Sequence, residues 1–144
     1  MAQFKQLDNM IFIGPQPSIQ ELEEAKHQGI RTVIDMRLPN ETARPNSELA
    51  AEAGLAYVNI PVNRAALSIS QVNEFDRVIK QHAGPFLVHC ATGARAALMI
   101  LVSRARENNW TAQQVFGEAV LMGFDLRNAP EFAQFVSQST HASS

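Results

Sequence analysis

The sequence predicts an α/β fold in one domain, with a central, mainly parallel sheet of about four strands flanked by helices. Short apolar runs of strand character alternate with longer helical segments along the chain. Three helical segments open with Ser or Thr followed three residues later by Glu or Gln, the capping-box pattern of a helix start. Such alternation is typical of parallel sheets, whose strands are joined by helical crossovers. The 144 residues fit a single domain spanning residues 1–144.

Each expected element follows from a local signal. The expected strands are apolar runs that end near a Gly, Pro or polar residue: Met10–Ile13, Thr32–Asp35, Ala56–Ile60 and Phe86–His89. The expected helices follow capping residues, with approximate ends: Ser18 to Gln28, Asn46 to Gly54, Ser68 to Gly84, and Thr111 to Met122. A last helix carries Phe132, Phe135 and Val136, Pro39–Pro45 is a polar loop, and residues 141–144 form a frayed tail.

One further helix is expected at the centre of the fold. The run Ala96–Val102 is apolar on all sides, which predicts a helix buried by its neighbours, and Asn108-Asn109 ends it. This run is also the longest apolar stretch, and it is far too short to span a bilayer.

Charge and cysteine content exclude several classes of function. The net charge is −2, so there is no basic surface for nucleic acid or an anionic membrane. A single cysteine excludes an intrachain disulfide, and no Cys or His cluster predicts a metal site. The N-terminus lacks a signal-peptide pattern, so we expect a reducing, cytoplasmic setting in which a thiol stays usable. No coiled-coil pattern or apolar stripe predicts an oligomer.

The segment HCATGARA, residues 89–96, has the residue types of a thiolate anion site. Cys90 directly follows an expected strand, and ligands of parallel sheets gather at the carboxyl ends of strands. The start of a helix stabilises a thiolate and binds an oxyanion through its unpaired N–H groups. Gly93 lets the loop turn its N–H groups inward, and Arg95 offers a planar, charged fork for two anion oxygens.

The predicted site consists of catalytic residues, an oxyanion-binding loop at residues 91–95 (the cradle) and a neighbouring histidine. Cys90 and Arg95 are the expected catalytic residues. The expected oxyanion-binding residues form the loop that follows the cysteine: Ala91, Thr92, Gly93, Ala94 and Arg95. The hydroxyl of Thr92 can donate a further hydrogen bond to the anion. His89 has two possible roles. It could orient Cys90 through a backbone hydrogen bond, or it could be a structural residue at the end of the strand.

The chain resembles the phosphatase-like domain of the beta-lactamase-hydrolase-like family, a bacterial branch of the cysteine-dependent tyrosine and dual-specificity phosphatase fold. The similarity rests on an ordered set of segments over about residues 8–126: FIGPQPSIQEL, GIRTVIDMR, AGLAYVNIPV, FLVHCATGAR and GFDL. It implies hydrolysis of a phosphate ester through a cysteinyl-phosphate on Cys90, with no metal or organic cofactor. Inorganic phosphate or sulfate is expected to bind the same loop.

Three positions depart from the phosphatase pattern. Only four residues separate Cys90 from Arg95, where phosphatases usually have five. Ala96 stands where a Ser or Thr usually helps the thiolate leave. Asn63 lies in the loop that usually carries an aspartate as general acid, and an amide cannot supply that proton.

Other carboxylates could replace the missing acid. Asp35 ends the second expected strand, and Glu41 lies in the next loop. Each also has a plainer role, Asp35 as a structural hydrogen-bonding partner and Glu41 as a solvated surface charge. Arg37 and Arg64 could border the pocket, or could form ion pairs.

Two other functions fit the same loop. CATGAR also matches C-x-x-G-x-R of rhodanese-like sulfurtransferases, where the cysteine carries a persulfide and no general acid is needed. A non-catalytic module that binds an oxyanion or a phosphopeptide is the third reading, in which Cys90 does no chemistry.

Overall fold

The computed structural model describes residues 4–41 and 46–140, and it has the predicted α/β architecture. Its five-stranded sheet has the order β1-β2-β5-β3-β4. The strands are β1 (Lys5–Gln6), β2 (Ile11–Gly14), β3 (Thr32–Asp35), β4 (Ala56–Asn59) and β5 (Phe86–His89). The last four are parallel, and only β1 runs antiparallel, beside β2. The prediction of a mainly parallel sheet is therefore confirmed.

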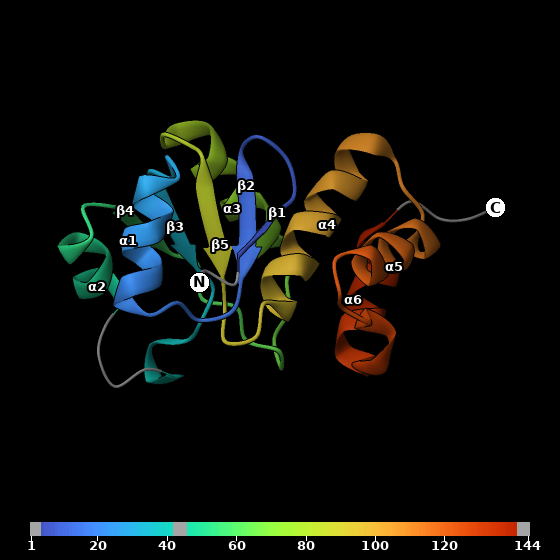
Figure 1. Cartoon of the computed structure of the whole chain (residues 1–144). Coiled ribbons are helices and arrows are strands. Elements are labelled where there is room, and N and C mark those ends of the chain that lie inside the picture. The colour runs from blue at the N-terminus through green and yellow to red at the C-terminus, as the bar shows by residue number, and fades with distance from the viewer. Residues whose placement is uncertain (1–3, 42–45, 141–144) are drawn as a thin grey trace.

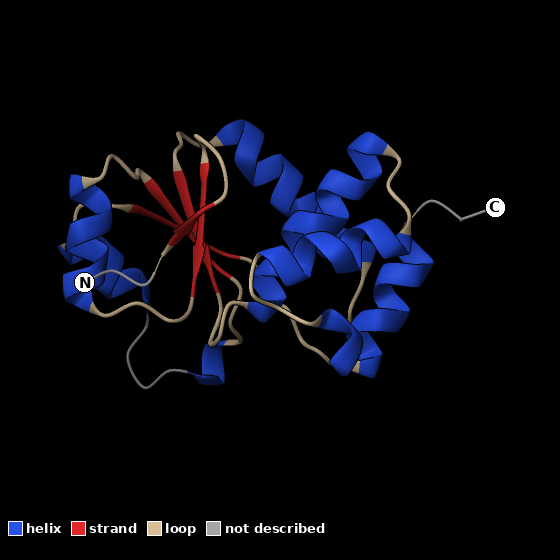
Figure 2. Cartoon of the chain, turned by 45° about the vertical axis from the view of Figure 1, so that its right-hand side comes forward, coloured by secondary structure: helices blue, strands red, loops and turns tan. Residues whose placement is uncertain are grey.

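The helices form layers on both faces of the sheet. They are α1 (Ile19–His27), α2 (Asn46–Glu52), α3 (Ile69–Gln81), α4 (Ala94–Asn108), α5 (Ala112–Leu121) and α6 (Pro130–Ser139), with short 3₁₀ turns η1 (Pro39–Glu41) and η2 (Leu126–Asn128). Helices α1 and α2 cover one face, while α3 and α4 cover the other (Figures 1 and 2). Helices α5 and α6 pack outside α4.

The predicted capping boxes fix three helix starts. Ser18, Ser68 and Thr111 each accept a hydrogen bond from the first turn of their helices, and Glu21, Gln71 and Gln114 bond back to the cap backbone. A cap of this kind is typically worth about 1 kcal/mol, because it satisfies N–H groups that have no helical partner. Local sequence therefore sets the boundaries of α1, α3 and α5.

The structure differs from the expected elements at a few points. Strand β1 was not expected, since two residues of an edge strand give no periodic pattern. Residues 39–41, expected as loop, form η1, and the rest of that expected loop lies outside the described residues. Helix α2 begins at Asn46 and ends at Glu52 rather than at Gly54. The expected tail at 141–144 also lies outside the described residues.

Helix α4 forms the centre of the larger core, as its apolar run predicts. Every residue from Arg95 to Ser103 is buried, so α4 is enclosed by the sheet and by its helical neighbours. Its first turn is held in place by this packing. The loop that precedes α4 is therefore attached to a rigid element. In the described part of the chain, no helix has the length and apolarity needed to cross a membrane.

Candidate active site

The register of the sheet brings several strand ends to one edge. His89 at the end of β5 pairs with Gly14 of β2 on one side and with Asp35 of β3 on the other. Cys90 follows immediately, so it lies at the carboxyl edge between two flanking strands. The β5–α4 loop and η1 both lie at this end of the sheet in Figure 1.

The loop folds around the thiol of Cys90. The side chain is 1% exposed, and its Sγ accepts a hydrogen bond of 3.1 Å from the Gly93 backbone N–H. Gly93 is the N-cap of α4 and has a φ of 102°, which places its N–H toward the sulfur and is unfavourable for any residue with a Cβ. The thiol therefore lies at the N-terminus of a long helix, where the backbone provides positive potential.

The remaining loop residues fix this conformation. The Thr92 hydroxyl accepts a hydrogen bond of 3.4 Å from Ala94 N–H, and the Ala91 carbonyl accepts one of 3.1 Å from Gln16 N–H. Ala91 and Thr92 are exposed, whereas Gly93 and Arg95 are buried. The loop thus has an open outer rim and a buried inner wall that holds the sulfur and the guanidinium.

Arg95 is bound end-on by Glu41 of η1. Its Nη1 donates to Glu41 Oε2 at 2.7 Å, and its Nη2 donates to Glu41 Oε1 at 2.6 Å. Nη1 also donates to the Val62 carbonyl at 3.0 Å. These bonds use both Nη1 hydrogens and one of Nη2. Nε–H and the second Nη2 hydrogen, which lie on one edge of the planar group, are not used by these partners.

The Arg95–Glu41 pair is charged on both sides. The hydrogen bonds from Arg95 lower the pKa of Glu41 to about 2, so this carboxylate is ionised at neutral pH. The bonds to Glu41 raise the pKa of Arg95, and the Cys90 thiol adds to this effect. The expectation that Glu41 is a solvated charge is wrong, and it cannot replace the missing acid, because a general acid must carry a proton.

Asp35 belongs to a buried network beneath the loop. Its Oδ1 accepts from Arg37 Nε at 3.0 Å, and its Oδ2 accepts from Arg37 Nη2 at 3.1 Å and from the Tyr57 hydroxyl at 2.9 Å. Burial opposes the charge of Asp35, but the hydrogen bonds and charge of Arg37, together with the neighbouring His89, outweigh it and hold the pKa of Asp35 below its ordinary value. Burial and the charge of Asp35 raise the pKa of Tyr57. Asp35 is thus an ionised, paired strand-end residue and cannot donate a proton.

His89 lies inside the same layer as a neutral ring. Burial lowers the pKa of His89 to about 4, so the imidazole is uncharged at neutral pH. Its Nδ1 is 3.4 Å from the Cys90 carbonyl and 3.9 Å from Asp35 Oδ1. Both neighbours are acceptors, which favours the tautomer with the proton on Nδ1. His89 therefore contacts the backbone of the cysteine through Nδ1.

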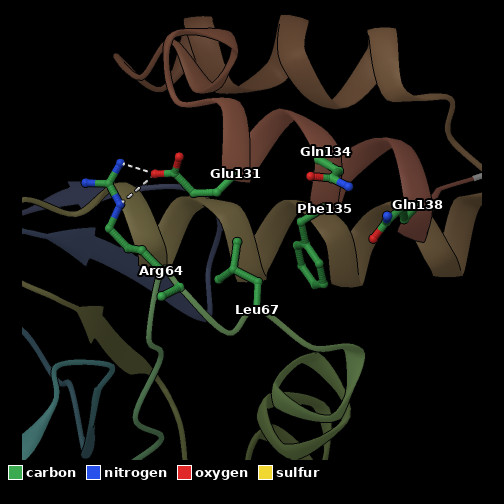
Figure 3. A pocket seen from close by; sticks show the side chains of 7 residues that line it. Arg64, Leu67, Glu131, Gln134, Phe135 and Gln138 are labelled. Carbon is green, nitrogen blue, oxygen red and sulfur yellow. Dashed lines mark hydrogen bonds and ion pairs between the residues drawn. The ribbon is translucent and has the colours of Figure 1, made fainter.

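Asn63 takes part in the turn of its own loop. Its Oδ1 accepts a hydrogen bond of 2.9 Å from Ala65 N–H, and its carbonyl accepts one of 2.9 Å from Ala66 N–H. The next residue, Arg64, donates to Glu131 Oε1 on α6 at 2.6 Å and stacks 4.6 Å from the ring centre of Phe132. Figure 3 shows Arg64 extending from this loop to Glu131. Arg64 and Arg37 both form ion pairs, one exposed and one buried.

A cavity of about 310 Å³ adjoins the loop on the side of η2. Ala94 contributes to its wall from α4, Arg64 from the Asn63 loop, and Phe124 and Asp125 from the turn before η2. Phe124 lies directly against the loop, since its Cζ is 2.9 Å from the place where a Cβ on Gly93 would be. The sequence did not single out Phe124 or Asp125 as site residues. Their only signal was the GFDL segment, which carries no spacing rule that links it to the cysteine.

No metal site is evident in the described residues. Among residues 4–41 and 46–140, no three His, Cys, Asp or Glu side chains are grouped so that they could hold a metal ion.

Solved structures share this fold closely. A candidate phosphatase from Neisseria meningitidis superposes with a TM-score of 0.79 at 27% identity, covering 96% of this chain and 99% of that one. TpbA from P. aeruginosa, solved in complex with pTyr, superposes with a TM-score of 0.76 at 16% identity, covering 92% of this chain and 82% of that one. The second likeness shows the fold alone.

The sequence comparisons identify the family. The beta-lactamase hydrolase-like protein of Xylella fastidiosa (strain Temecula1 / ATCC 700964) is 29% identical over 128 residues, which are 85% of this chain. The aligned part spans only 30% of that protein's length. The model of the phosphatase-like domain of beta-lactamase hydrolase-like protein matches residues 3–107, which include Cys90 and Arg95. The chain belongs to the family of phosphatase-like domains of beta-lactamase hydrolase-like proteins.

Proposed function

We propose that this chain is a cysteine-dependent phosphatase that hydrolyses phosphate monoesters through a cysteinyl-phosphate on Cys90. The observation that carries the proposal is the joint placement of the Cys90 thiol and the Arg95 guanidinium on the inner wall of one loop. Family membership and the phosphatase fold of the structural relatives support the same reaction class.

The first step is a displacement at phosphorus. The Cys90 thiolate attacks, the bond from phosphorus to the ester oxygen breaks, and the phosphoryl group is transferred to sulfur. Arg95 binds two equatorial oxygens through Nε–H and the second Nη2 hydrogen, while loop N–H groups bind the others. Because Glu41 binds the Nη1–Nη2 end of the guanidinium and Val62 binds Nη1, these donors are oriented before the substrate arrives.

Hydrolysis of the intermediate is the second step. Water attacks the cysteinyl-phosphate and the Cys90 thiolate leaves. Ala96 has no hydroxyl to stabilise the departing sulfur, and it is fully buried in α4. We therefore expect this step to be slow and the overall activity to be low to moderate.

Aryl phosphates are the class of substrate that this site should hydrolyse fastest. A phenolic leaving group needs less protonation than an alkoxide, so it tolerates the absence of a carboxylate at Asn63. The pTyr bound by TpbA belongs to this chemical class.

The test compares p-nitrophenyl phosphate hydrolysis by the wild type, Cys90→Ser and Arg95→Lys. We expect no turnover above background in Cys90→Ser, and a loss on the order of 10²- to 10³-fold in Arg95→Lys, since Lys cannot present two parallel donors. Equal turnover by the wild type and Cys90→Ser would rule out the thiolate mechanism. Phosphate binding without any wild-type turnover would instead indicate an oxyanion-binding module.

A sulfurtransferase remains the second candidate, and the four-residue spacing between Cys90 and Arg95 favours it. A smaller cradle fits a persulfide, which needs no general acid. Transfer of sulfur from thiosulfate to cyanide, measured in the wild type and in Cys90→Ser, separates the two activities. Cys90-dependent transfer that exceeds phosphate release would assign sulfur chemistry to the site.

A further inference from the structure

We propose that Asp125 is the general acid of this site and takes over the role that Asn63 cannot perform. The inference rests on the phosphatase proposed above, and it concerns the fate of the leaving group. Both carboxylates considered from sequence are held by a guanidinium, Glu41 by Arg95 and Asp35 by Arg37, and each would have to give up that partner to take up a proton. Proton transfer to the ester oxygen therefore needs another carboxyl group near the loop.

The cavity beside the loop is where a leaving group would lie. It measures about 310 Å³, at the lower end of the ~300–1,000 Å³ range of small-molecule sites. Ala94, the first residue of α4, contributes to its wall, and the rings of Phe124 and Phe132 supply apolar surface for an aryl group. A phosphoryl group bound in the loop can thus place its ester substituent in this cavity.

Asp125 and the Asn63 loop contribute to the wall of the same cavity. Arg64, adjacent to Asn63, lines it together with Asp125. The preceding residue, Phe124, contacts Gly93, so the position of Asp125 is fixed relative to the cradle. We place the proton transfer from Asp125 in this cavity, which the Asn63 loop also lines through Arg64.

The hydrogen bonding of Asp125 leaves one oxygen for this role. Its Oδ1 accepts from Arg127 N–H at 3.1 Å and caps η2, which orients the carboxyl group. Within the described part of the chain, Oδ2 has no hydrogen-bond donor. The side chain is exposed, so it can exchange a proton with solvent between turnovers.

The proton of Asp125 passes to the leaving group and is regained when the cysteinyl-phosphate is hydrolysed. As the phosphorus–oxygen bond breaks, the leaving oxygen takes the proton of the Asp125 carboxyl and departs as an alcohol. Asp125 is then a carboxylate, and it accepts a proton from the water that attacks the cysteinyl-phosphate. Orthophosphate and the Cys90 thiolate are released, and the acid is restored.

The experiment uses aryl phosphates that differ in leaving group, p-nitrophenyl phosphate and phenyl phosphate, with Asp125→Asn. Asn caps a helix about as well as Asp, so this substitution retains the bond to Arg127 and removes the proton. We expect kcat/KM for phenyl phosphate to fall on the order of 10²-fold, and for p-nitrophenyl phosphate to fall less than about tenfold. Asp125→Ser also retains a helix cap, and it should show the same difference in kcat/KM between the two substrates as Asp125→Asn.

Two further variants give the control and the rescue. Glu118→Gln removes the same charge from exposed α5, outside the cavity, and should keep both rates within about twofold. Asn63→Asp added to Asp125→Asn should restore at least about tenfold on phenyl phosphate, because it returns a carboxyl to the loop whose Arg64 lines the cavity.

The outcomes separate the two proposals. Equal losses on both substrates, or no loss, overturn the role of Asp125 while the Cys90 mechanism stands. A wild-type protein without Cys90-dependent hydrolysis of either substrate overturns both.

Discussion

Arg95 and Glu41 form a bidentate ion pair across 54 positions of the chain, and this pair fixes the arginine of the candidate site. The Arg95 side chain is 10% exposed and that of Glu41 is 25% exposed, so the pair is partly shielded from solvent. A guanidinium held along one edge by a carboxylate presents its other edge to an incoming anion. The pair therefore links η1 directly to the cradle at Cys90.

Glu41→Gln tests the importance of this link. The amide keeps the shape but loses the charge, so Arg95 should be less well oriented. We expect kcat/KM for p-nitrophenyl phosphate to fall on the order of 10- to 100-fold. Because the pKa of Glu41 is about 2 against 4.5 for a free side chain, the pair persists above pH 4.5 and is lost as the pH falls toward 2. The loss of kcat/KM in Glu41→Gln relative to the wild type should therefore be present throughout pH 5–7.

The matched control is Glu74→Gln. Glu74 pairs with Arg77 on the surface of α3, where the side chains are 39% and 57% exposed. Exposed pairs are worth about 0–1 kcal/mol, so this variant should retain the wild-type rate. An equal loss in both variants would indicate a general effect of charge rather than a role for the Arg95–Glu41 pair.

His89 predicts how stability depends on pH. Its pKa is about 4 in the folded protein and 6.5 in the unfolded chain, so unfolding takes up a proton between these values. Stability should fall as the pH decreases through this window, by up to about 3 kcal/mol. Urea unfolding of the wild type and of His89→Asn at pH 7, 6 and 5 measures the effect. The variant should show a flatter profile, and identical slopes would contradict the assignment of a buried, neutral His89.

Gly93→Ala tests whether the loop geometry is essential. The φ of 102° disfavours Ala, and its Cβ would lie 2.9 Å from Phe124 Cζ. We expect the free energy of unfolding to fall by about 1–3 kcal/mol, and hydrolysis to fall more than about tenfold as the N–H moves away from Cys90 Sγ. Gly117→Ala on α5 is the control, since a Cβ there meets no atom within 4 Å. It should stabilise the helix by about 0.5–1 kcal/mol at the wild-type rate. Wild-type activity in Gly93→Ala would show that the left-handed turn is dispensable.

The predictable part of the fold is the part encoded locally. The capping boxes at Ser18, Ser68 and Thr111 and the apolar run of α4 specify helices through neighbouring residues, and the structure places helices there. Strand β1 exists only through its pairing with β2, so no local pattern could indicate it.

The site was predictable only where its residues are adjacent in sequence. Cys90, Gly93 and Arg95 lie within one loop, and their grouping follows from the spacing. The partnership of Arg95 with Glu41 depends on how the turn after β3 folds back over the strand ends. The place of Asp125 beside the loop likewise depends on the packing of α5 against α4 and of η2 against α5 and α6. The spacing of residues along the sequence cannot predict such long-range contacts.

The most direct test of the central claim is detection of the covalent intermediate. Wild-type protein is mixed with excess p-nitrophenyl phosphate, quenched in denaturant within the first turnovers, and analysed by intact and peptide mass. We predict the added mass of one phosphoryl group on the peptide that contains Cys90, accumulating because Ala96 offers no hydroxyl to speed the second step. The adduct should be absent from Cys90→Ser. Turnover by the wild type with no adduct on Cys90, or with an adduct on another residue, would contradict the cysteinyl-phosphate mechanism.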